Sequence, residues 1–87
     1  MSEVKKYMIV KGYYTHGNKY DEYYCGKDFR GIPIFTKDKK APSIIVFNLE
    51  IFDDGSVNPK HSKMIEDLIS DLKGYFPDNR FSCRGLL

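Results

Sequence analysis

The sequence has no long apolar run, and this absence excludes a membrane-spanning helix. No segment approaches the roughly 18 consecutive apolar residues that such a helix needs. The first residues, Met1 to Lys6, precede alternating rather than continuous hydrophobicity, which argues against a signal peptide. We therefore expect a cytoplasmic protein with no membrane partner.

Cysteine is scarce, and the positions of the two cysteines exclude the common zinc sites. Cys25 and Cys83 lie far apart in the chain, without the paired spacing of such a site. We interpret them as reduced, partly buried thiols of a cytoplasmic protein. A disulfide bond between them is the alternative.

The sequence also lacks the motifs that specify a nucleotide or a metal ion. The glycines of Gly26 to Gly31 do not lead through Gly-Lys-Ser/Thr into a helix, as a phosphate-binding loop does. Asp53, Asp54 and Ser56 lack the regular spacing and closing Glu of a calcium loop, so turn formation explains them. We expect no cofactor and no metal, and we interpret His61 as a surface residue.

Length and composition predict one small domain, residues 1–87. With 41% hydrophobic and 30% charged residues, the chain can fold unaided around one core. The charge is uneven, because residues 1–42 carry nine Lys and Arg against five Asp and Glu, whereas residues 43–87 carry five against seven. The net charge of +2 is too small to indicate a nucleic-acid partner by itself.

The first half of the chain predicts a β-hairpin and a short extended piece. Val4 to Thr15 is rich in Val, Ile and Tyr, and a break at His16 to Lys19 separates it from an aromatic run, Tyr20 to Cys25. Ile32 to Phe35 is apolar but contains Pro33, which cannot donate a hydrogen bond to a sheet. This piece is therefore an edge strand or a loop.

The second half predicts a strand, a tight turn, a helix and a last strand. Ser43 to Phe52 alternates as a central strand does, with one apolar face made by Ile45, Phe47, Leu49 and Ile51. Asn58 and Pro59 favour a helix start, and the helix should end near Tyr75. Its apolar stripe is Met64, Ile65, Leu68, Ile69, Leu72 and Phe76. Arg80 to Arg84 alternates as a short strand does.

These elements predict an α+β fold, a small two-layer sandwich. An antiparallel β-sheet in the order β-β-(β)-β-α-β would carry one amphipathic helix on one face. A single helix leaves the other face of the sheet uncovered. We take that uncovered face as the best clue to function.

Tyrosines interleaved with cations form the one pattern that indicates a binding surface. We expect the hairpin and the adjoining loop to contact a partner through Tyr13, Tyr14, Tyr20, Tyr23, Tyr24, Lys11, Lys27 and Arg30. Tyrosine is frequent at the centres of protein interfaces, and it also stacks on single-stranded bases beside lysines that neutralise phosphates. A third interpretation is that the tyrosines only stabilise the hairpin.

A protein partner is the leading hypothesis, because Asp21, Glu22 and Asp28 in the same region would repel a phosphate backbone. A single-stranded nucleic-acid binder using the same face is the alternative. An exposed strand edge could also pair with a second copy to form a homodimer. In size and composition the chain resembles small accessory proteins of phages and mobile elements, including anti-CRISPR-type inhibitors, which implies inhibition of a larger macromolecular machine.

An enzyme is a further alternative, built on Cys25 or His16. Catalysis needs a nucleophile or base with an orienting partner, and Cys25, His16 and Asp21 could meet across the hairpin. Their spacing is not diagnostic, because short polar residues near a turn are usually turn formers. The sequence therefore favours a non-enzymatic protein.

Overall fold

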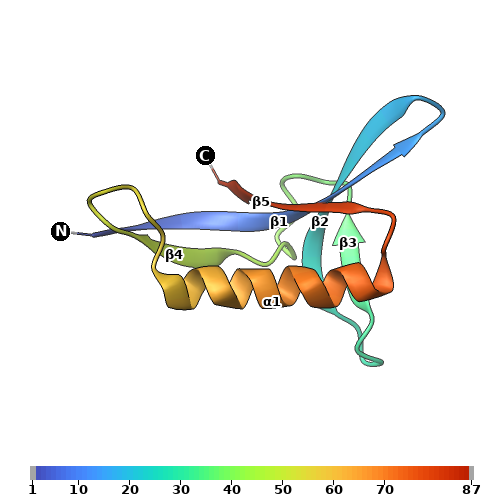
Figure 1. Cartoon of the computed structure of the whole chain (residues 1–87). Helices are drawn as coiled ribbons and strands as arrows, with labels where there is room; N and C mark the ends of the chain where they lie inside the picture. Colours follow the sequence, from blue (N-terminus) through green and yellow to red (C-terminus); the bar gives the residue numbers. More distant parts are fainter. Residues whose placement is uncertain (1, 87) are drawn as a thin grey trace.

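The described part of the chain folds as one antiparallel sheet of five strands with a single helix, so the predicted α+β fold is confirmed (Figure 1). The structure, a computed structural model, describes residues 2–86. In chain order the elements are β1 (Glu3–Thr15), β2 (Asn18–Lys27), β3 (Pro33–Thr36), β4 (Phe47–Ile51), α1 (Pro59–Tyr75) and β5 (Arg80–Gly85).

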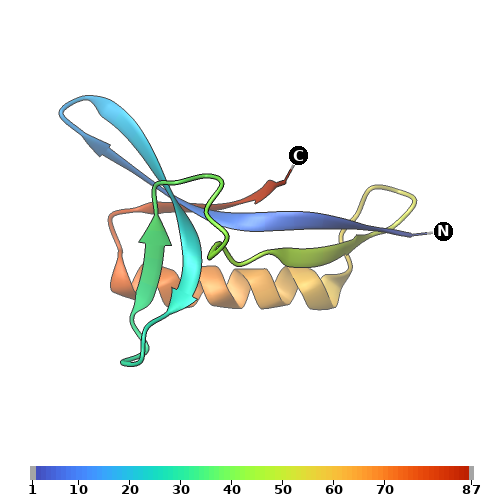
Figure 2. The same ribbon diagram turned by 180° about the vertical axis from the view of Figure 1, so that it is seen from behind.

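Strand β1 is the centre of the sheet, and it pairs with three other strands. Val10 to Gly12 pair with β2 and also with β5, so these two strands flank opposite sides of β1. Glu3 to Tyr7 pair with β4. Figures 1 and 2 show the resulting long strand running the length of the molecule with shorter strands along it. The predicted strand Ser43 to Phe52 is therefore not the central one.

The predicted hairpin is confirmed, and its turn is made by two residues. His16 and Gly17 both have positive φ angles, 52° and 79°, between Thr15 and Asn18, which pair with each other. Two positive φ angles in a two-residue turn match the right-handed twist of the strands. The hairpin therefore continues β1 and β2 beyond the rest of the sheet (Figure 1).

Two strands of the middle region differ in how well the alternation predicted them. Strand β3 pairs only with β2 among the described strands, as expected of an edge strand that contains Pro33. Strand β4 is shorter than the predicted Ser43 to Phe52, because residues 43–46 belong to the preceding loop. Ile45 there donates its backbone N–H to the carbonyl of Tyr24 and stays 37% exposed.

Helix α1 begins and ends where its sequence signals predict. The Asn58 side chain accepts a hydrogen bond from the Lys60 N–H, and Pro59 occupies the first turn. Ile65 and Leu72 are buried against the sheet, but Met64, at the margin of the predicted stripe, is 46% exposed. Within residues 2–86, no helix combines the length and apolar character of a membrane span.

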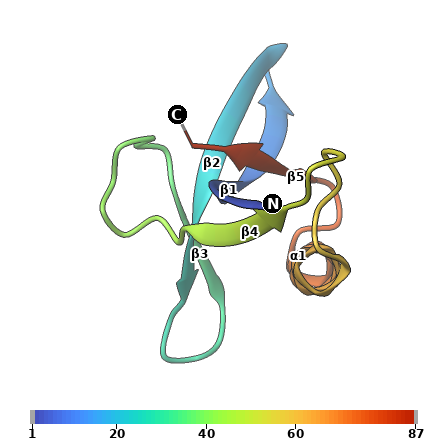
Figure 3. The same cartoon turned by 90° about the vertical axis from the view of Figure 1, so that its left-hand side faces the viewer.

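The face of the sheet opposite the helix is partly covered, which corrects the prediction of an open face. Figure 3 shows α1 on one side of the sheet and the loop after β3 on the other. Under this loop, Met8, Val10 and Tyr23 form a second buried cluster against which Ile44 and Leu86 pack. The larger cluster lies between the sheet and α1 and contains Ile9, Tyr24, Leu49, Ile51, Ile65 and Leu72.

Candidate functional site

Three of the predicted contact residues lie inside the protein. Tyr23 and Tyr24 are 7% and 6% exposed, on opposite faces of β2, and each belongs to one of the two apolar clusters. Lys11 is 9% exposed. The expectation that these side chains form a contact surface is therefore corrected, because burial leaves them no area for a partner.

The buried ammonium group of Lys11 is held by aromatic rings and one carboxylate. Its Nζ atom lies 3.2 Å from Glu22 Oε1, 4.4 Å from the centre of the Phe35 ring and 4.2 Å from that of Phe76. Aromatic faces attract a cation, and a carboxylate compensates its charge. Lys11 thus stabilises the contact between the sheet and the end of α1.

The other predicted tyrosines lie on the projecting part of the hairpin. The rings of Tyr13 and Tyr20 stack with centroids 5.5 Å apart on the helix side of the sheet, and Lys37 Nζ lies 5.8 Å from the Tyr20 ring. Tyr14 points to the opposite side and is 65% exposed. Of the predicted tyrosines, Tyr14 therefore offers the most free ring surface.

Lys27 and Arg30 do not lie with these tyrosines. They are at the other end of β2, where the loop between β2 and β3 extends away from the hairpin (Figure 1). Lys27 Nζ lies 2.9 Å from Asp71 Oδ2 of α1, and Arg30 Nη2 lies 3.2 Å from Asp28 Oδ2. The predicted contact residues thus divide between two separate surfaces and the core.

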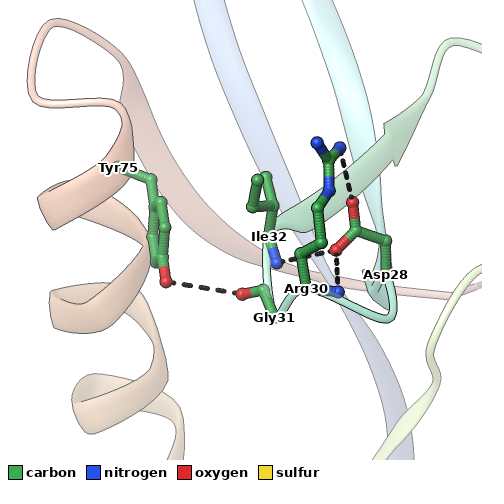
Figure 4. Close-up of polar contacts among 5 residues, drawn as sticks. All are labelled: Asp28, Arg30, Gly31, Ile32 and Tyr75. Atoms are coloured by element: carbon green, nitrogen blue, oxygen red, sulfur yellow. Dashed lines mark hydrogen bonds and ion pairs between the residues drawn. The ribbon is translucent and has the colours of Figure 1, made fainter.

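The loop between β2 and β3 is built around the carboxylate of Asp28. Oδ1 accepts hydrogen bonds from the backbone N–H groups of Arg30 (2.8 Å) and Ile32 (3.0 Å), while Oδ2 pairs with the Arg30 guanidinium (Figure 4). The Asp28 N–H donates to the Ile32 carbonyl, and the Gly31 N–H to the Asp28 carbonyl. We call residues 28–32 the Asp28 loop.

Two further features fix the Asp28 loop in place. Gly31 has a φ of 81°, a conformation that costs glycine little. The hydroxyl of Tyr75, at the end of α1, donates to the Gly31 carbonyl at 3.4 Å (Figure 4). Together with the Lys27–Asp71 ion pair, this contact attaches the loop to the helix as well as to the sheet.

Ionisation of Asp28 is favoured by this arrangement. The backbone N–H of Ile32 is the main cause that lowers the pKa of Asp28 below its ordinary value, and the N–H and guanidinium of Arg30 add to it. Burial acts in the opposite direction and is outweighed. The carboxylate that organises the loop is therefore charged at neutral pH.

The Asp28 loop presents Phe29, a residue that is 96% exposed. The guanidinium of Arg30 lies 5.6 Å from the centre of the Phe29 ring. Nearby in the sequence, Ile32 and Ile34 are 38% and 44% exposed, and Tyr75, which bonds to the loop, is 48% exposed. Sequence reasoning missed Phe29, although an aspartate before it and a glycine two residues after it are signals of a tight loop.

The residues of the proposed enzyme site do not come together. His16 lies in the hairpin turn, whereas Cys25 is seven residues into β2 from Asn18, which corresponds to about 23 Å along an extended strand. The Cys25 thiol donates to the Tyr23 carbonyl. Among residues 2–86, no cluster of three His, Cys, Asp or Glu side chains is placed to hold a metal ion.

Cys83 and His61 have structural surroundings. Both cysteines are free thiols, and burial raises the pKa of the Cys83 thiol. His61 is half-buried, and its Nδ1 accepts a hydrogen bond of 2.9 Å from the Glu50 N–H, which attaches the start of α1 to β4. The interpretation of His61 as a surface residue is therefore wrong.

Comparisons of the chain with protein-family models, with curated proteins and with solved structures gave no match. The Asp28 loop with its exposed Phe29 is the candidate site.

Proposed function

We propose that this protein is a non-enzymatic protein-binding module whose central contact is the Asp28 loop. The observation that carries the proposal is the 96% exposure of Phe29 on a loop ordered by hydrogen bonds to Asp28. Phe and Arg are both enriched in the centres of protein interfaces, and here Phe29 and Arg30 are adjacent.

Order in the free loop supports this function. A flexible loop loses conformational entropy when a partner immobilises it, and this loss weakens binding. The Asp28 loop has already lost that entropy, because its backbone is bonded to the Asp28 side chain and to Tyr75. Phe29 can therefore enter a partner pocket without a large ordering cost.

The exposed residues indicate the chemistry of the partner surface. Burying a Phe side chain contributes about 1.5–3 kcal/mol, so the partner should offer an apolar pocket for Phe29. Ile32 and Tyr75 would extend the apolar contact, and Arg30, whose side chain is 63% exposed, would favour an acidic or carbonyl-rich rim. We further propose that the protein acts in the cytoplasm as an inhibitor that occupies a surface of a larger macromolecular machine.

The test compares two exposed aromatic residues, Phe29 in the loop after β2 and Tyr14 of β1 near the hairpin turn. Wild type, Phe29→Ala and Tyr14→Ala would be immobilised and used to capture partners from nuclease-treated lysate, and affinities would then be measured with the purified partner. We expect Phe29→Ala to lose at least about thirtyfold in affinity, corresponding to about 2 kcal/mol, and Tyr14→Ala to bind as wild type does.

Folding is checked separately by thermal unfolding of both variants. Because both side chains are exposed, neither substitution should move the midpoint by more than a few degrees. Equal affinities of Phe29→Ala and wild type for the partner would contradict the proposal. A loss confined to Tyr14→Ala would move the site to the hairpin.

A further inference from the structure

A second surface, on the face of the sheet opposite α1, gathers exposed cations. Strand alternation directs Lys6 of β1 and Arg80 and Arg84 of β5 to this face, because they share it with the buried Met8 and Val10. Lys19 joins them, since it pairs with Tyr14 on the same side. We call the set Lys6, Lys19, Lys39, Lys40, Arg80 and Arg84 the basic face.

Part of the basic face is hollowed. A pocket of about 210 Å³ is lined by Tyr14, Lys19, Asp21, Arg80 and Arg84, together with Val10 and Gly12 of β1 and Phe81 and Ser82 of β5. A Cβ atom at Gly12 would lie 3.6 Å from Asp21 Oδ1, so the Asp21 carboxylate lies beside the backbone of β1 at this point. The pocket thus combines an exposed aromatic ring with three cationic side chains and the carboxylate of Asp21.

A second hollow continues the basic face along the sheet. Its volume is about 330 Å³, and it is lined by Met8, Lys39, Lys40, Gly85 and Leu86. Arg84 pairs with Met8 in the β1–β5 ladder, so the two hollows adjoin at this pair. Cations therefore follow one another from the hairpin to the loop after β3.

The acidic residues near the hairpin cancel only part of this charge. Asp21 is paired with Arg84 at 3.1 Å, and Glu22 is turned to the helix side, where it pairs with Lys11. The Asp38 carboxylate accepts the N–H of Lys40 within its own loop. Lys19 and Arg80 form no ion pair with any of residues 2–86, so these two cations are free for a ligand.

We propose that the basic face binds single-stranded nucleic acid, with Tyr14 stacking on a base and Lys19 and Arg80 contacting phosphates. An exposed aromatic ring beside cations on a sheet is the arrangement that suits unpaired bases. The helix is not placed to read a duplex major groove from this face, because α1 lies on the other side of the sheet (Figure 3). The exposed side of α1 also carries Glu66, Asp67 and Asp71.

This site goes beyond the protein-binding function of the Asp28 loop. The loop lies at one end of β2, whereas Lys19 lies at the other end, beside the hairpin turn. Nucleic-acid binding can therefore be measured without the protein partner. Failure of one proposal would leave the other intact, because they depend on different residues.

The experiment is a titration of fluorescently labelled 20-nucleotide oligo-dT and oligo-U, followed by anisotropy at several salt concentrations. The test variant is Lys19→Glu/Arg80→Glu, and the matched control is Lys60→Glu/Lys73→Glu on α1, which changes the net charge equally. If both test residues contact phosphates, the slope of log K against log[salt] should fall in magnitude by about 1.4, since each single-strand contact contributes about 0.7. The control should keep the slope of wild type.

Two single substitutions separate direct contact from general attraction. Tyr14→Ala should weaken binding on the order of tenfold without a change in the salt slope, because stacking involves no counterion release. Asp21→Asn should strengthen binding, because it removes a carboxylate and leaves Arg84 available for phosphate.

Several results would overturn the proposal. Absence of binding to both oligonucleotides at 50 mM salt would do so, and so would equal losses in the test and control variants. Equal affinity for polyglutamate of the same length would show that any polyanion suffices. Tighter binding of a DNA duplex than of either single strand would exclude the stacking role of Tyr14.

Discussion

Lys11 and Phe76 lie far apart in the sequence, yet the ammonium group of Lys11 is 4.2 Å from the centre of the Phe76 ring. The residue that follows α1 thus covers a cation of the central strand, and Phe35 covers it at 4.4 Å. Glu22, on the neighbouring strand, compensates the charge. This contact connects the helix end, β1, β2 and β3.

Removal of the Lys11 charge should therefore destabilise the fold. We expect Lys11→Met to lower the free energy of unfolding by about 2–3 kcal/mol, because Glu22 keeps its charge at a half-buried position without a partner. The double variant Lys11→Met/Glu22→Gln should recover part of this loss, and urea unfolding measures both. Wild-type stability of Lys11→Met would show that the cation contributes nothing.

Acid should loosen the Asp28 loop before it unfolds the core. The pKa of Asp28 is lowered in the folded protein. The ionised carboxylate therefore stabilises the fold fully above the ordinary carboxyl range near pH 4, and this stabilisation is lost as the pH falls through the lowered pKa. The protection factors of the Arg30 and Ile32 amides, which compare each exchange rate with that of an unprotected amide at the same pH, should fall over that range in wild type. In Asp28→Ala, both protection factors should be low at every pH, whereas unchanged protection would mean that the carboxylate does not order the loop.

The start of α1 allows two causes of stability to be separated. Asn58 accepts the Lys60 N–H as a helix cap and donates to Glu50 Oε1 at 2.7 Å. Asn58→Ala should cost about 1–2 kcal/mol through loss of the cap. Asn58→Asp keeps a capping oxygen but places a carboxylate against Glu50, so its stability should improve relative to wild type as the pH falls through the carboxyl range. A constant difference at all pH values would contradict the contact with Glu50.

Two glycines should respond oppositely to alanine. Gly31 has a φ of 81°, a backbone conformation in which any side chain is strained, although the position of an added Cβ atom is open within 4 Å. Gly31→Ala should therefore lower the free energy of unfolding by about 1–2 kcal/mol. Gly74 lies in α1 with equally open space, and Gly74→Ala should stabilise the protein by up to about 1 kcal/mol. Thermal unfolding of both variants checks the sign, and a loss in both would show that the space around Gly74 is needed.

The local elements could be predicted because each depends on neighbouring residues. The hairpin turn at His16 and Gly17, the Asn58 cap and the last strand carry their signals within a few positions. The length of β4 could not be predicted in this way. Residues 43–46 alternate as a strand does. If β4 were longer, they would continue along the same edge of β1, but β2 pairs with that edge further along the strand. The N–H of Ile45 therefore donates to the carbonyl of Tyr24 instead.

The candidate site needed the tertiary structure. Alternation in the sequence determined that Tyr23 and Tyr24 face opposite sides of β2, but both sides of the sheet are covered there, one by α1 and the other by the loop containing Ile44. Tyr14 stays exposed because the hairpin projects beyond both covers. Phe29 is exposed because Asp28 and Tyr75 fix a loop outside the core. Periodicity specifies which face a side chain takes, whereas its burial depends on distant segments that pack on that face.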